Sequence, residues 1–418
     1  MEEKKEQINR KSKILEALEN EHTSITFDDP LENDMVLNMG PQHPATHGVL
    51  RLLIKLDGET VLASVPELGY LHRGYEKLAE NCNFHEFIPH TDRLDYLSPL
   101  SNNTAYVLAV EKLIGIEAPP RAQYIRTLIS ELARISNHLM FLGSLAMDVG
   151  ALTVWMWSFR EREKLYDIFE KIAGARFTTS YTRIGGVAQD ITPETLRIIR
   201  RFIDELPEKI LECGKLINTN RIFLGRVDGV GVITKERAID LGVTGPCLRA
   251  CGVEHDLRRA NPYLVYQNLD FDIPVYEGGD CLARYYVRMD EIKESIKIIR
   301  QLMDKMPVGK VKATQPKKVL PGKQRIYTKM EELIHDFILI NFGINPPVGE
   351  IYYAVEAPKG ELGFYINSNG EGQPWRMKIR SPSFVNLQSI STMMKGAMIS
   401  DVVAIIGSLD PVMGEADK

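Results

Sequence analysis

Residues 39–56 read MGPQHPATHGVLRLLIKL, a rigid loop that runs without a break into a strand. The first ten of these residues hold two prolines and two glycines, which exclude the interior of a helix. Leu50–Leu56 and Thr60–Val65 are rich in strand-forming residues, and the Asp57-Gly58-Glu59 sequence between them is typical of a tight turn. The sequence therefore predicts a constrained loop that feeds a β-hairpin.

Downstream of the hairpin, from Arg73 to about Met306, apolar residues recur at helical spacing. Thr192 followed by Pro193 resembles an N-cap with proline in the first turn of a helix. We predict helices over 122–142, 193–216, 289–306, 330–341 and 387–406, strands over 350–356 and 362–367, and a short mixed segment over 225–252.

These elements predict an α+β fold, a mainly helical core with small antiparallel sheets at the periphery. We expect four regions along the chain. They are an N-terminal extension (1–33) with a surface helix over 2–20, a β-hairpin region with the histidine loop (34–72), a helical core (73–306) and a C-terminal α+β region that returns to the core (307–418).

Charge and motif content argue against two classes of ligand. The net charge of −5 over 418 residues provides no basic surface for nucleic acid. Neither a Gly-x-Gly-x-x-Gly dinucleotide loop nor a Walker-type phosphate loop occurs in the sequence. We therefore expect no NAD and no nucleic acid to bind this chain.

The segment Leu139–Phe159 carries one charge, Asp148, in 21 residues and is long enough to cross a bilayer. Gly143 and Gly150 interrupt it, and an amphipathic segment precedes it. We expect buried helices at the centre of a soluble core, with membrane contact made through partner subunits.

The five cysteines are scattered along the chain, and their number is odd, so a disulfide framework is not expected. Cys247 and Cys251 are four residues apart, which differs from the spacing of a metal knuckle. We interpret the cysteines as small buried apolar residues and expect no metal on this chain.

Three polar features allow a functional interpretation beside a structural one. His43 and His47 lie in the proline-stiffened loop, where they are either loop residues or part of a site. Asp148 is a carboxylate in an apolar run, either bonded to backbone amides near Gly150 or acting as a proton donor or an anchor for a histidine. Tyr96 precedes a proline in a polar turn and is either packing or a donor.

Four motifs together resemble the D-subunit family of bacterial respiratory NADH:quinone oxidoreductase (complex I). They are MGPQHPATHGVLRLLIKL (39–56), LHRGYEKL (71–78), RLDYL (93–97) and DPVMG (410–414). The resemblance runs from about residue 34 to the C-terminus. It implies a quinone-reduction site in a proton-translocating enzyme that is active only when assembled.

This family is similar in turn to the large subunit of nickel–iron hydrogenases, so the resemblance implies a hydrogenase-like scaffold. Where the hydrogenases carry two pairs of cysteines, this chain has Asp95, Ser98, Val412 and Glu415. Nickel–iron chemistry requires those thiolates. We therefore expect a scaffold without the metal, with Tyr96 inside the vacated site.

By resemblance, His47, Tyr96 and Asp148 match the residues of the quinone site, with His43 in the quinone loop. Tyr96 and His47 would supply protons as the quinone is reduced, and Asp148 would orient His47. Arg73 matches an arginine near an iron–sulfur cluster held by a neighbouring subunit, although an ordinary salt bridge is its alternative.

The implied partners are the iron–sulfur small subunit, the C-type and ferredoxin-like subunits and a membrane subunit that forms the quinone channel. The implied location is peripheral, on the cytoplasmic side of the bacterial inner membrane. The sequence leaves open the quinone type and an equivalent complex fed by ferredoxin or another donor. A hydrogenase, or a structural scaffold derived from one, is a further reading.

One position departs from the family pattern. Many members have histidine in an Arg-Met-His sequence near the cluster, where this chain reads Arg176-Phe177-Thr178. Threonine does not titrate, so the resemblance implies a lower and less pH-dependent cluster potential, suited to a low-potential menaquinone.

Overall fold

A computed structural model describes residues 34–315 and 317–418. The extension over 1–33, with the surface helix expected at 2–20, lies outside the described residues. The division of the chain into four regions stays a prediction.

The N-terminal sheet is antiparallel with the order β1 (Asp34–Met39), β2 (Arg51–Asp57) and β3 (Thr60–Glu67). Asp57 lies opposite Thr60, which confirms the predicted hairpin. The histidine loop connects β1 to β2. Gly40, with φ of +93°, is required at its start because a Cβ atom there would collide with the carbonyl oxygen of Leu50.

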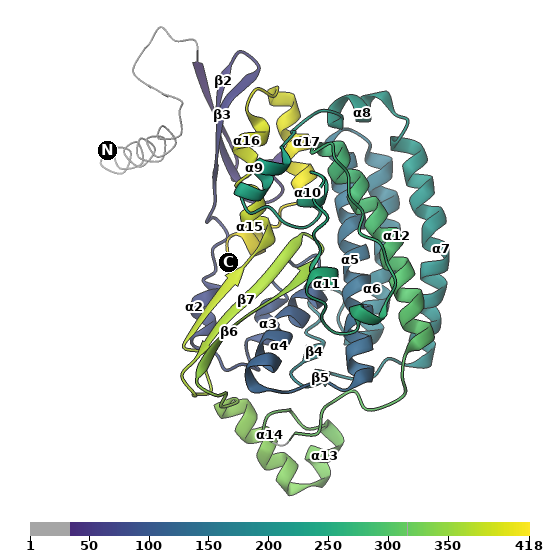
Figure 1. The fold of residues 1–418 in the computed structure, drawn as a ribbon, viewed down its shortest axis with the longest axis vertical. Helices are drawn as coiled ribbons and strands as arrows, with labels where there is room; N and C mark the ends of the chain where they lie inside the picture. The colour runs from purple at the N-terminus through teal and green to yellow at the C-terminus, as the bar shows by residue number, and fades with distance from the viewer. Residues whose placement is uncertain (1–33, 316) are drawn as a thin grey trace, which may run out of the picture.

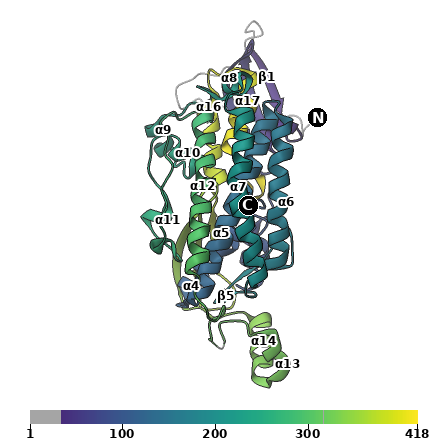
Figure 2. The same ribbon diagram turned by 90° about the vertical axis from the view of Figure 1, so that its right-hand side faces the viewer.

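Long helices form the body of the molecule and lie side by side in Figures 1 and 2. They are α4 (Pro99–Ile114), α5 (Pro120–Asp148), α6 (Leu152–Ala173), α7 (Pro193–Ile217) and α12 (Cys281–Lys305). The helices expected at 122–142 and 193–216 are confirmed, the first extended at both ends. The helix expected at 289–306 begins earlier, at Cys281, because buried Arg284 and Arg288 interrupt its apolar pattern while Asp280 caps its first turn.

The apolar segment 139–159 is split between α5 and α6. Side chains from Leu139 to Ala146 are almost all buried, as expected. The second half differs from the expectation, because Leu152 is 54% and Met156 56% exposed on α6. Among the described helices, none combines the length and apolar character that crossing a membrane requires.

A second antiparallel sheet packs on the helices, with the order β6 (Gly349–Ala357), β7 (Gly360–Ser368) and β8 (Arg376–Arg380). The first two strands confirm the predicted runs. The predicted last helix over 387–406 is wrong. The chain forms α15 (Pro382–Leu387), α16 (Ile390–Met394) and α17 (Ile399–Leu409) instead, because residues 396–397 leave the helix to exchange backbone hydrogen bonds with Val61 of β3.

The remaining elements are short. They are η1 (Pro44–Thr46), α2 (Tyr75–Ala79), α3 (Ile88–Thr91), β4 (Thr182–Arg183), β5 (Gly186–Val187), α8 (Arg221–Val227), α9 (Lys235–Asp240), α10 (Pro246–Arg249), α11 (Leu257–Ala260), η2 (Tyr266–Asn268), α13 (Lys323–Thr328), α14 (Met330–Phe342) and α18 (Met413–Ala416). The segment 225–252, expected to be mixed, holds short helices and no strand.

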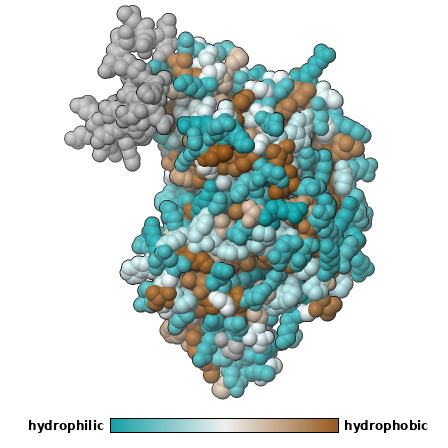
Figure 3. All heavy atoms as spheres, in the orientation of Figure 1, coloured by the Kyte–Doolittle hydropathy of each residue, from teal (hydrophilic) through white to brown (hydrophobic). Residues whose placement is uncertain are grey.

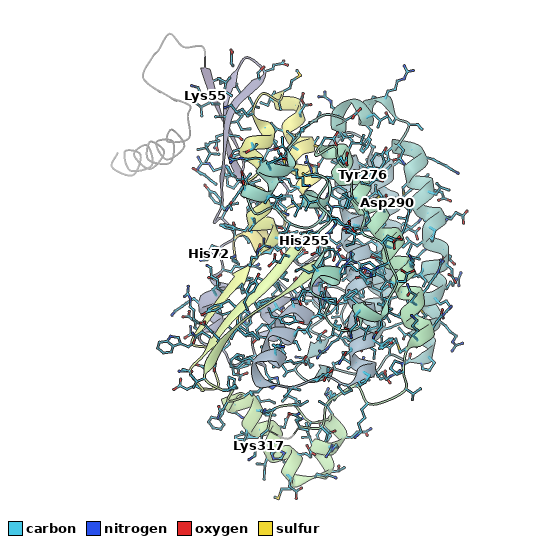
Figure 4. The ribbon with its side chains drawn as sticks, viewed as in Figure 1. Lys55, His72, His255, Tyr276, Asp290 and Lys317 are labelled. Carbon is cyan, nitrogen blue, oxygen red and sulfur yellow. The ribbon has the colours of Figure 1, made fainter. Side chains whose placement is uncertain are left out.

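Buried charges cross-link the helices. Arg126 of α5 makes two hydrogen bonds to Glu111 of α4 at 2.8 and 2.6 Å, and Arg249 of α10 pairs with Glu291 of α12 and Glu356 of β6. Nearer the surface, the Tyr276 hydroxyl donates to Asp290 at 2.6 Å (Figure 4). Because such pairs tolerate little displacement, they hold the framework around the site described next.

Candidate functional site

The histidine loop presents His47 to the end of helix α5. His43 caps η1 by accepting a hydrogen bond from the Ala45 amide at 3.3 Å, and the hydroxyl of Thr46 donates to the His43 carbonyl. His47 follows at the C-cap with φ of 50° and ψ of 58°, a left-handed conformation that is uncommon outside glycine. Strained residues of this kind cluster at functional sites, so the conformation supports a role for His47.

Asp148 is the last residue of α5, and its Oδ2 lies 2.7 Å from Nε2 of His47. The two side chains are 6% and 15% exposed, so the pair is shielded from water. Of the expected alternatives for Asp148, the geometry matches the anchor for a histidine. Within the described residues, Asp148 makes no hydrogen bond to a backbone amide.

The pKa of His47 is set by opposing effects. Burial acts to lower it, but the hydrogen bond and charge of Asp148, together with the charge of Asp410, raise it above its ordinary value. Since Nε2 faces Asp148, Nδ1 is the nitrogen left to face a substrate. A protonated His47 can therefore donate from Nδ1 near neutral pH.

Tyr96 approaches the same region from the turn before α4. Its ring centroid lies 6.1 Å from that of Phe177, and its hydroxyl has no hydrogen-bond partner within the part of the chain that the structure describes. Burial and the charge of Asp95 raise the pKa of Tyr96, so the phenol stays protonated and available as a donor.

A buried ion pair links the surroundings of Tyr96 and His47. Lys359 Nζ lies 2.7 Å from Asp410 Oδ2 and donates to Asn137 Oδ1 at 2.6 Å, while the Asn137 amide donates to Asp410. Burial opposes the charges, but their attraction lowers the pKa of Asp410 and raises that of Lys359. Both Tyr96 and His47 feel this pair electrostatically.

The four positions that replace the hydrogenase thiolates gather beside the pair. All four are buried. Gly414 packs against the carbonyl of Leu94, and the Glu415 carboxylate accepts from the Ser383 amide at 2.9 Å. Within the described residues, one oxygen each of Asp95, Ser98 and Glu415 lacks a hydrogen-bond partner. Burial and the charge of Asp95 raise the pKa of Glu415 to about 7.

Arg73 lies on the surface beside these motifs. Its guanidinium donates to the carbonyl of Arg93 at 2.7 Å and that of Gly414 at 3.2 Å, and it stacks 4.5 Å from the ring of Tyr75. The alternative of an ordinary salt bridge fails, since no carboxylate of the described chain pairs with it. Asp417 fixes the approach by accepting the amides of Gly69 and Leu71.

His43 and Thr178 remain near the edge of the site. His43 is exposed at the tip of the loop, while Thr178 is half-buried next to the exposed ring of Phe177. The structure thus brings His47 and Asp148 into direct contact, and it places Tyr96 beside the same buried charges. Four cysteines, at 213, 247, 251 and 281, are buried as expected, whereas Cys82 is half-buried.

Sequence reasoning missed Lys359, Asn137 and Gly407. Lys359 follows a proline in the turn between β6 and β7, where a lysine is ordinarily exposed. Gly407 of α17 has room for no side chain, because a Cβ atom would lie 2.7 Å from Asp148 Oδ2. No local pattern indicates either, since both depend on chain segments more than two hundred residues away.

Known proteins resemble this chain over nearly its whole length. Residues 148–418 match the family described as the 49 kDa subunit of respiratory-chain NADH dehydrogenase. The first of two NADH-quinone oxidoreductase D-subunits of Chloroherpeton thalassium is 60% identical over 98% of this chain and 93% of its own length. The NADH-quinone oxidoreductase D-subunit of Salinibacter ruber is 53% identical, over 97% and 94% respectively.

Proposed function

Because the chain belongs to the family of the 49 kDa subunit of respiratory-chain NADH dehydrogenase, we propose that its own part of the reaction is quinone reduction at His47 and Tyr96. The chain is a subunit of an NADH-quinone oxidoreductase. The observation that carries the proposal is the shielded contact between His47 and Asp148, which leaves one imidazole nitrogen free.

Reducing a quinone to a quinol requires two electrons and two protons. One carbonyl oxygen would accept a hydrogen bond and then a proton from the Tyr96 hydroxyl, and the other from Nδ1 of His47. Both donors act where negative charge develops on the substrate, which is where hydrogen bonds accelerate a reaction. Asp148 stabilises the imidazolium before transfer, and His43 lies at the mouth of the loop.

Electrons would reach the quinone from an iron–sulfur cluster on a neighbouring subunit. The exposed guanidinium of Arg73 supports this arrangement, because no carboxylate of the described chain neutralises it. A positive charge at that surface favours a cluster that gains an electron. The partners, the cytoplasmic side of the membrane and the coupling to proton translocation follow from family membership and stay parts of the proposal.

The kinship with nickel–iron hydrogenases also stays a prediction. It is supported by the gathering of Asp95, Ser98, Val412 and Glu415 in one buried place, which would follow if they occupied a former metal site. Oxygen and hydrocarbon groups have replaced all four thiolates there.

The test is NADH:quinone reductase activity in membranes that carry Tyr96→Phe or His47→Asn. Asparagine is chosen because it tolerates the left-handed backbone of His47, and phenylalanine keeps the ring against Phe177. We expect quinone reduction to fall at least about tenfold, as loss of one proton donor costs, while NADH:ferricyanide activity persists.

Tyr124→Phe is the matched control, since Tyr124 lies near the start of α5, roughly 36 Å along the helix from Asp148. Its quinone reductase activity should equal that of the parent. Survival of full quinone reduction in both site variants would show that the protons come from other groups.

A further inference from the structure

The hairpin of α13 and α14 exposes apolar side chains on all sides. Figures 1 and 2 show it projecting from the lower end of the molecule, and Figure 3 shows hydrophobic atoms next to hydrophilic ones there. Those of α14 that are at least 43% exposed are Met330, Leu333, Ile334, Phe337, Ile338, Ile340 and Phe342. Because helices that are apolar all round are ordinarily buried, this hairpin marks a contact surface.

A cavity of about 1190 Å³ separates the hairpin from the helical core. Ile172 and Arg183 line it on the core side, and Lys323, Ile326 and Tyr327 line it on the hairpin side. Small-molecule pockets measure about 300–1,000 Å³. The volume therefore suits a stretch of polypeptide better than a small ligand.

The cavity is positively charged. Arg183, Lys312 and Lys323 contribute to its lining, and no carboxylate of the described chain lies within ion-pair distance of any of them. Burial, followed by the charge of Arg183, lowers the pKa of Lys312. The lining also holds Arg325, which pairs with Glu332. The segment between α12 and α14 adds further lysines, including Lys317 at the lower end in Figure 4.

His85 adds a second, independent sign of a missing partner. Its side chain lines the cavity at 7% exposure, and neither ring nitrogen has a hydrogen-bond partner within the described residues. An imidazole left without partners in a buried place costs free energy. An occupant with polar atoms would remove that cost.

We propose that this cavity and the faces of α14 bind a segment of another protein subunit that carries carboxylates beside apolar side chains. The carboxylates would pair with Arg183, Lys312 and Lys323, and the apolar side chains would cover α14. A lipid surface is the poorer occupant because the hairpin lies at the end of the molecule opposite the histidine loop (Figures 1 and 2). This exclusion of lipid rests on the proposed function, in which quinone enters from the membrane near His47.

The first test places a photo-crosslinker, benzoyl-phenylalanine, at Phe337 of α14 in the assembled complex. We expect one crosslinked product, joining Phe337 to a peptide of another subunit rich in Asp or Glu. Ile222 of α8, 69% exposed, is the matched control and should not reach the same peptide. Crosslinks to lipid only, to a second copy of this chain, or no product at all would overturn the proposal.

The second test measures how much of each subunit co-purifies with Lys312→Glu/Lys323→Glu. We expect the subunit found by crosslinking to fall by about tenfold, as for a hot-spot pair, and by more at high salt. Lys235→Glu, an exposed change on α9, should leave it unchanged. Unchanged retention in the double variant would contradict the proposed charge pairing. Neither readout involves quinone, so each result is independent of the roles of His47 and Tyr96.

Discussion

Asp148 Oδ2 and His47 Nε2 lie 2.7 Å apart although 101 positions separate the two residues in the chain. The contact joins a loop between two strands to the end of the longest helix. Asp148 stands where α5 must end, because Gly150 follows with φ of +90°. The pair therefore couples the substrate loop to the helical core.

Asp148→Asn should make quinone reduction fail at lower pH than in the parent. The charge of Asp148 raises the pKa of His47 against the effect of burial. Without it the pKa falls, and the donating imidazolium is lost sooner as pH rises. We expect the alkaline limb of the activity profile to move by at least about one pH unit toward acid. A profile that keeps its position would argue against His47 as the donor.

Gly407→Ala should reduce activity without destabilising the protein. The new Cβ atom would lie 2.7 Å from Asp148 Oδ2 and 3.6 Å from His47 Nε2, so the pair must shift. Alanine otherwise favours a helix by about 1 kcal/mol over glycine. Gly225→Ala on α8, which has nothing within 4 Å of the added atom, is the control and should keep full quinone reductase activity.

Glu415→Gln should stabilise the complex increasingly as pH rises. Folding raises the pKa of Glu415 to about 7, so the folded state holds this proton more tightly than the unfolded chain. That contribution to stability is complete below the unfolded pKa and is lost as pH rises through the folded one. Glutamine stays neutral and avoids a loss of up to about 3 kcal/mol.

Heat inactivation of the assembled complex, followed between about pH 6 and pH 8, measures this difference. The midpoint of Glu415→Gln should rise relative to the parent across that interval. Glu254→Gln, which changes an exposed carboxylate, should show no trend. A constant offset for Glu415→Gln would mean that Glu415 is ionised throughout.

The reduction potential of the neighbouring cluster should depend little on pH. Thr178 cannot titrate, and the ring beside it, Phe177, is apolar. Redox titration at several pH values measures the slope, which we expect to stay well below the 59 mV per pH unit, approximately, of one proton per electron. Thr178→His should steepen it. A steep slope in the parent would mean that another group supplies the proton.

Local pattern accounts for the elements that the chain forms from neighbouring residues. The hairpin around Gly58 follows from its turn residues and alternating strands, and α7 from its cap at Thr192 and its apolar period. Pattern failed where a distant segment competes. Residues 396–397 leave a helical run to bond with Val61, and the start of α12 is hidden by arginines whose partners lie elsewhere.

The sequence by itself determined the rigid histidine loop, the type of most elements and, through four motifs, the family. Each depends on residues close together in the chain, which local sterics and hydrogen bonding control. Only the tertiary structure decided that Asp148 faces His47, that Lys359 lies buried between Asn137 and Asp410, and that α14 stands exposed. Such contacts join residues separated by many turns of chain, and their energies arise from burial and charge in the assembled core.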